Sequence, residues 1–66
     1  MTTLISKLET ELDEVEIKVS KLNAFLERAG TTVSIHQQDL LEIQLGILQT
    51  YHTILIARIS DLRETT

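Results

Sequence analysis

Residues 5–29 read ISKLETELDEVEIKVSKLNAFLERA, and this stretch decides the fold. Its apolar residues recur at alternating intervals of three and four positions over more than three heptads. This is the pattern of a helix that packs along one seam. The members of this first seam are Ile5, Leu8, Leu12, Val15, Val19, Leu22, Leu26 and Ala29. The sequence therefore predicts an amphipathic helix over about residues 3–29.

A second helix is predicted over about residues 35–63, and it carries two apolar rows. Its seam has the same heptad spacing and consists of Leu41, Leu45, Leu48, His52, Leu55, Ile59 and Leu62. A second row, here called the outer stripe, runs beside it and consists of Leu40, Ile43, Ile47, Tyr51 and Ile54. One partner helix can cover one seam, so the outer stripe needs another partner. We therefore expect the chain to associate with itself through the second helix.

The turn between the helices is short. Gly30 is placed to end the first helix in a left-handed C′ position. Ser34 and Gln37 form the S-x-x-Q pattern of a capping box at the start of the second helix. So short a connection forces antiparallel neighbours. The predicted fold is all-α: residues 1–66 form a single helical-hairpin domain that assembles into a symmetric helical oligomer.

Composition excludes several classes of protein. The 66 residues include no Cys and no Pro, which argues against a disulfide scaffold, a thiolate metal site and a multi-strand β fold. The net charge of −4 disfavours binding to long nucleic acids. The most apolar stretch, residues 40–59, is interrupted by polar and charged residues, so we expect no membrane span and a cytoplasmic location.

Catalytic chemistry is not expected. His36 and His52 lie about 24 Å apart on one straight helix, too far to share a metal. His36 with Asp39 is a lone pair of possible ligands, and His52 occupies a seam position, where a half-buried histidine bonded to the other helix is expected. The chain has neither a Gly-rich phosphate loop nor a nucleophile elbow. The sequence therefore predicts a protein without catalytic residues, metal or cofactor.

Three basic residues are candidates for binding an anion. Lys18 and Lys21 lie three residues apart on one face of the first helix, and Arg58 lies in an apolar part of the second. The alternative is that Lys18 pairs with Glu14, and Arg58 with Asp61 or with Glu42 of a partner copy. Tyr51 is either a platform for stacking a base or an ordinary interface aromatic.

A longer pattern resembles a known family. Residues 21–27 read KLNAFLE, and residues 40–59 follow the pattern LLxxQLxxxxxYxxILxxRI. Together they resemble a family of very small phage and prophage proteins, found also in crAss-like phages, that includes sponges of the anti-CBASS protein 2 type. The resemblance implies helical oligomers, typically hexamers, that sequester cyclic oligonucleotide immune signals without catalysis. It implies that cyclic dinucleotides bind between protomers and cyclic trinucleotides in separate pockets, all within the bacterial host cytoplasm.

The resemblance also implies site residues. Lys21 matches the lysine that contacts a phosphate, Asn23 lies in the same motif, and Arg58 matches the arginine of the last helix. Leu4 or Ser6 stands where the family usually has an aromatic residue, and neither can stack on a base. The expected function is a sponge for cyclic di- or trinucleotides. The alternative is a helical-hairpin module for protein–protein interaction or structural oligomerisation.

Overall fold

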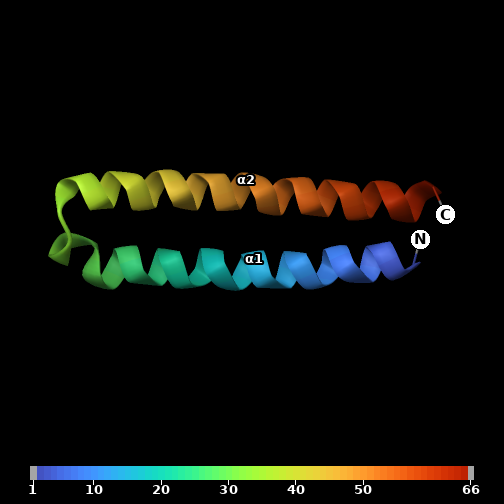
Figure 1. The fold of residues 1–66 in the computed structure, drawn as a ribbon, viewed down its shortest axis with the longest axis horizontal. Helices are drawn as coiled ribbons and strands as arrows, with labels where there is room; N and C mark the ends of the chain where they lie inside the picture. Colours follow the sequence, from blue (N-terminus) through green and yellow to red (C-terminus); the bar gives the residue numbers. More distant parts are fainter. Residues whose placement is uncertain (1, 66) are drawn as a thin grey trace.

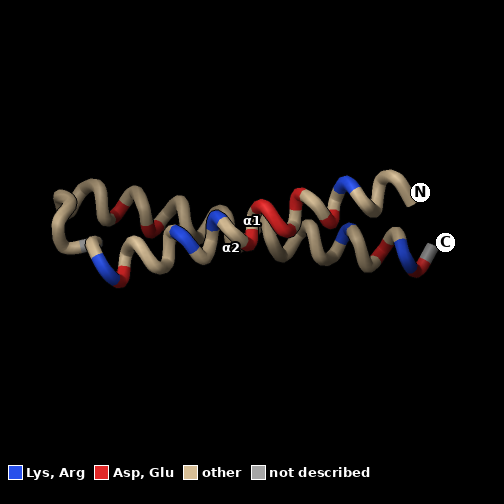
Figure 2. Tube along the Cα trace, turned by 90° about the horizontal axis from the view of Figure 1, so that it is seen from below, with Lys and Arg blue, Asp and Glu red and all other residues tan. Residues whose placement is uncertain are grey.

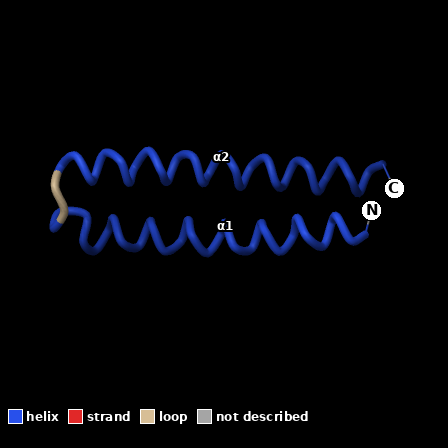
Figure 3. Tube along the Cα trace, in the orientation of Figure 1, coloured by secondary structure: helices blue, strands red, loops and turns tan. Residues whose placement is uncertain are grey.

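A computed structural model describes residues 2–65, which form an antiparallel helical hairpin (Figure 1). Helix α1 spans Thr2–Ala29, the 3₁₀ helix η1 spans Gly30–Thr32, and helix α2 spans Ile35–Thr65. The two long helices run side by side, and the ends of the chain lie together away from the turn (Figure 3). The predicted all-α hairpin is confirmed, and both helices begin and end within two residues of the expected positions.

The turn differs from the expectation at one residue. The Ser34 hydroxyl accepts a hydrogen bond from the Gln37 backbone N–H at 3.1 Å, as the capping pattern predicts. Gly30 was expected to end α1 in a left-handed C′ position, but it begins the 3₁₀ helix η1. Instead, η1 tightens the end of α1, and the Thr32 hydroxyl donates to the Ala29 carbonyl oxygen at 2.6 Å. The hydrogen bonds of η1 and of the Thr32 hydroxyl are made to carbonyl groups that the end of an α-helix leaves unpaired.

The core lies where the two predicted seams meet. Its buried members come equally from both helices and all lie in the half of the hairpin near the chain ends: Leu8, Val15, Leu55 and Ile59. Ile5, Leu12, Val19 and Leu62 pack against them. Toward the turn, seam residues such as Leu22 and Leu45 are only half-buried. The hairpin is therefore held mainly at its open end.

A two-helix shape leaves much surface uncovered. The hairpin measures 48 × 14 × 13 Å and has a radius of gyration of 15.0 Å. A compact chain of this length would have a radius of gyration of about 11 Å. The accessible surface is 4872 Å², against about 4,250 Å² for a compact monomer of this mass. The outer stripe accounts for part of the difference, since Ile43 and Ile47 are 60% and 64% exposed.

Helix α2 is also apolar along much of its length. Residues 35–64 are long and apolar enough to cross a membrane, judged by length and composition alone. A helix that packs its apolar sides against other helices passes the same test, so one such helix is weak evidence for a membrane span.

Candidate functional site

Charges are distributed unevenly along the hairpin (Figure 2). In α1, all five charged residues of the segment 9–16 are acidic, whereas Lys18, Lys21 and Arg28 lie closer to the turn. In α2, the segment 43–57 contains no Lys, Arg, Asp or Glu. Lys18 and Lys21 therefore lie beside an uncharged length of α2.

Lys18 and Lys21 line a shallow groove between the helices, here called the basic groove. Its volume is about 510 Å³, and its lining residues are Lys18, Lys21, Leu22, Phe25, Gln44 and Leu48. The groove thus combines two ammonium groups, one aromatic ring and one amide. Across residues 2–65, neither lysine forms an ion pair, so the alternative in which Lys18 pairs with Glu14 is not observed. Two unpaired ammonium groups beside an aromatic ring suit an anion that also carries a flat base.

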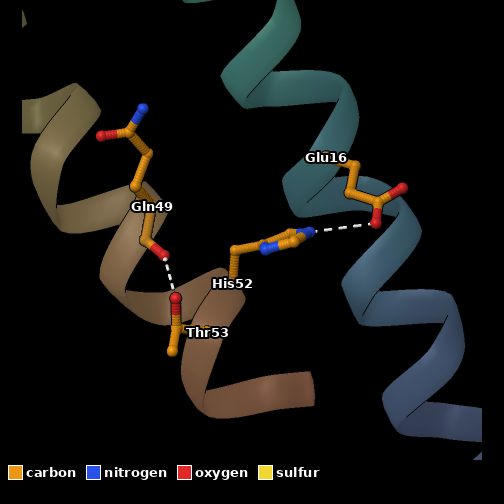
Figure 4. Close-up of polar contacts among 4 residues, drawn as sticks. All are labelled: Glu16, Gln49, His52 and Thr53. Atoms are coloured by element: carbon orange, nitrogen blue, oxygen red, sulfur yellow. Dashed lines mark hydrogen bonds and ion pairs between the residues drawn. The ribbon is translucent and has the colours of Figure 1, made fainter.

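The opposite flank of the hairpin carries the carboxylates that do find partners. Glu16 Oε1 and His52 Nε2 lie 3.0 Å apart across the helix interface, where the two side chains point toward one another (Figure 4). His52 is 29% exposed, which confirms the expected half-buried histidine bonded to the other helix. Glu9 and Arg63 form an ion pair between the same helices. This flank also has a groove of about 520 Å³, lined by Glu16, Val19, Ser20, Gln49, His52 and Thr53.

The two grooves differ in chemistry because they lie on different flanks of the interface. Within the second one, the Thr53 hydroxyl donates to the Gln49 carbonyl oxygen at 3.1 Å (Figure 4). Its charged lining residue is a carboxylate, which repels an anion. Of the two, only the basic groove offers positive charge.

Of the other candidate residues, Tyr51 and Arg58 lie on the flank of the hairpin that carries the basic groove, and Asn23 lies on the opposite flank. Gln44, Tyr51 and Arg58 are spaced by seven residues, so they project from nearly the same side of α2. Gln44 lines the basic groove, and Tyr51 and Arg58 therefore belong to the same flank. Asn23 follows Glu16 by seven residues, which places it on the flank of the ion pairs.

Distance separates Arg58 from the groove. Fourteen residues of helix place it about 21 Å from Gln44 along the axis, beyond the reach of a small ligand held at Lys21. Tyr51 lies between them and lines a third groove, on the outer face of α2. The candidate residues of one chain therefore form two separate positive positions rather than one site.

Phe25 and Gln44 line the basic groove and were not selected from the sequence. Phe25 lies four residues after Lys21 and seven after Lys18, a spacing that places all three on one side of α1. Gln44 belongs to the pattern shared with the phage family, but its role becomes visible only when α2 is placed against α1. The spacing of Phe25 from Lys18 and Lys21 could have identified it from the sequence alone.

Comparison with known proteins gives one match. The family model described as Sequestin matches residues 2–61, which is nearly the whole chain. The chain belongs to the Sequestin family. No curated protein and no solved structure matches it significantly. The family name is consistent with a protein that sequesters a molecule rather than one that transforms it. Among the described residues of this Sequestin protein, no group of three or more His, Cys, Asp or Glu side chains is placed to hold a metal ion.

Proposed function

We propose that this Sequestin protein is a sponge of the phage type: an oligomer that binds cyclic oligonucleotide immune signals and lowers their free concentration. The basic groove is the observation that carries the proposal, because it offers Lys18 and Lys21 without carboxylate partners beside the Phe25 ring. Membership of the Sequestin family and the resemblance to the anti-CBASS sponges support it. No catalytic step is involved.

Each lining group of the basic groove has a task in this proposal. An ammonium group binds a phosphate by a charge-assisted hydrogen bond, which is about twice as strong as a neutral one. Stacking of a base on an aromatic ring contributes about 1–3 kcal/mol. The Gln44 amide can both donate to and accept from the edge of a base. Phe25 thereby supplies the aromatic face that Leu4 and Ser6 cannot supply.

Arg58 would hold a second class of ligand. Its distance from the basic groove agrees with the resemblance, in which the arginine of the last helix serves cyclic trinucleotides in a pocket of their own. Tyr51 lies on the same flank of α2 between the two positions and offers an aromatic face to either. Asn23 would contribute only to a ligand that reaches the other flank, or that a partner copy places there.

Self-association is part of the proposal. The outer stripe is exposed along α2, and burying a large aliphatic side chain contributes about 1.5–3 kcal/mol. We propose a homo-oligomer, hexameric as the resemblance implies, with ligand pockets between copies. It acts as a soluble protein in the cytoplasm of the bacterial host, and binds neither long nucleic acids nor a membrane.

Titration calorimetry tests the binding. The purified oligomer is titrated with a panel of cyclic di- and trinucleotides, and at least one should bind with a stoichiometry below one per chain. Replacing Lys18 and Lys21 with Ala should weaken dinucleotide binding by at least tenfold, while Lys7→Ala, a lysine of the same helix outside the groove, should leave it unchanged. Absence of binding heat for the whole panel, with the oligomer verified, would refute the sponge.

The second candidate function is an interaction module without a small ligand. The exposed outer stripe favours it, because monomers rarely expose apolar patches larger than a few hundred Å². This candidate predicts an oligomer, or a stoichiometric protein partner recovered from bacterial lysate, with no response to any cyclic nucleotide.

A further inference from the structure

The outer face of α2 carries a third heptad seam, here called the outer seam. Its members are separated by alternating intervals of four and three: His36, Leu40, Ile43, Ile47, Thr50, Ile54, Ala57 and Asp61. All eight are exposed in the hairpin. A groove of about 700 Å³ lies along its middle, beside Gly46. A strict heptad repeat of this length fits another helix, and α1 already occupies the opposite side of α2.

We infer that the outer seam packs against the same seam of a second copy, with the two α2 helices antiparallel. The inference rests on the self-association proposed above and specifies its orientation and register. The outer seam alternates between two heptad positions, and in an antiparallel pair each kind faces the other kind across the contact. Leu40 of one copy therefore faces Ala57 of the other, Ile43 faces Ile54, and Ile47 faces Thr50. Large residues thus meet small ones along most of the contact, which fills space evenly.

Charge favours the same orientation. The antiparallel register places His36 of one copy beside Asp61 of the other at both ends of the contact. A parallel pair would instead place Asp61 against Asp61 and Ala57 against Ala57, which combines like charges with a void. The antiparallel arrangement also opposes the two helix dipoles.

Gly46 supports a close contact on one side of this seam. In the described chain, a Cβ added at Gly46 would have no atom within 4 Å beyond its chain neighbours and its own helix backbone, so the hairpin itself does not need glycine there. In the antiparallel register, Gly46 lies near Thr53 of the second copy. Two small residues on this flank allow the helix backbones to approach.

A second helix would cover surface that the hairpin leaves exposed. A stable interface buries about 800 Å² on each partner. The surface of the hairpin exceeds that of a compact monomer by about 600 Å² in total, and Ile43, Ile47 and Ile54 on the outer face of α2 are 60%, 64% and 51% exposed. In the dimer, α2 of each copy would pack against α1 on one side and against α2 of the second copy on the other.

The pairing would complete the candidate site. A two-fold axis across an antiparallel helix pair keeps the same flank of both copies on the same side. The basic grooves of the two copies would therefore open on one face, with both Tyr51 side chains between them, offset by about 7.5 Å along the helix axis. A ligand with two phosphates and two bases matches such a symmetric face.

Disulfide cross-linking tests the orientation, because the chain has no cysteine of its own. Single variants Leu40→Cys and Ala57→Cys are mixed, refolded together and oxidised, and one carries a tag that separates the possible dimers by mass. Both positions are exposed in the hairpin, so the variants should keep the helical spectrum of the parent. We expect the mixed dimer to exceed either homodimer at least tenfold. Glu14→Cys, on the exposed surface of α1, serves as the control that should not cross-link.

Other outcomes overturn the inference. Predominant Leu40 or Ala57 homodimers would show a parallel pair, and a monomer without cross-links would show that no second copy binds here. The pair Ile43→Cys and Ile54→Cys gives an independent check of the same register. Nucleotide titration of the parent protein is a separate readout: binding without the mixed dimer refutes only the antiparallel pair, and the mixed dimer without binding refutes only the sponge.

Discussion

Gly46 gives the sharpest prediction, because the hairpin and the assembly make opposite demands on it. Glycine inside a helix is less stable than alanine by about 0.8–1.0 kcal/mol. Apart from its chain neighbours and the backbone of its own helix, a Cβ at this position would meet no atom of the described residues within 4 Å, so no clash offsets the gain. Gly46→Ala should therefore stabilise the hairpin by about 1 kcal/mol, roughly a fivefold change in the unfolding equilibrium. For a domain of this size, that corresponds to a rise in melting temperature of about 4–8 °C.

A larger residue at the same position separates folding from association. Leucine has nearly the helix propensity of alanine, so Gly46→Leu should stabilise the isolated hairpin almost as much. Its side chain would occupy the space through which a second helix approaches, and self-association should weaken at least tenfold. Thermal unfolding followed by circular dichroism measures the first effect, at several protein concentrations so that dissociation is seen separately. Sedimentation measures the second.

Two results would refute this reasoning. If Gly46→Leu assembles as well as the parent protein, no helix approaches at Gly46, and the glycine is simply tolerated. If Gly46→Ala lowers the stability of a dilute, monomeric hairpin, the space around Gly46 is not open as the structure shows it.

Three further predictions concern the core, the interface and the polar contact. Leu55→Ala removes the most completely buried side chain and should lower the free energy of unfolding by about 2–5 kcal/mol in urea denaturation. Ile47→Glu places a charge in the outer seam and should dissociate the assembly in light scattering while the chain stays helical, because Ile47 is exposed in the hairpin. A double-mutant cycle with Glu16→Gln and His52→Gln should give a coupling of no more than about 1 kcal/mol by urea denaturation, since both side chains are partly exposed.

The fold followed from sequence because each helix carries its own periodicity. The first seam and the seam at Leu55 both appear in the core where the heptad spacing places them, and the Ser34 cap marks the start of α2 as expected. The backbone conformation at the end of α1 did not follow from the sequence. Gly30 permits a left-handed conformation but does not require one, and hydrogen bonding in the turn selected a 3₁₀ helix instead.

The candidate site was only partly visible in the sequence. Lys18 and Lys21 could be paired from their spacing on one helix. Gln44 could not be added, because its place opposite Phe25 depends on the register between α1 and α2. That register is fixed by packing and by contacts such as the one between Glu16 and His52, which join residues far apart in the chain. Sequence periodicity defines faces, whereas the groove is a property of two faces in contact.

An overall negative charge is compatible with anion binding because the charges are separated in space. The carboxylates of Glu9 and Glu16 contact Arg63 and His52 on one flank. Lys18 and Lys21 line the basic groove on the other flank and form no ion pair in the described chain, and Lys21 also borders a groove that contains Asp13 and Glu16. At physiological ionic strength, interactions between exposed charges fall off over about 8 Å. A ligand with two phosphates would experience mainly the lysines that it touches. A long nucleic acid would have to pass the acidic segment 9–16 as well, and each phosphate placed there would be repelled. The same charge pattern therefore suits the small cyclic anion proposed above better than a polymer of the same chemistry.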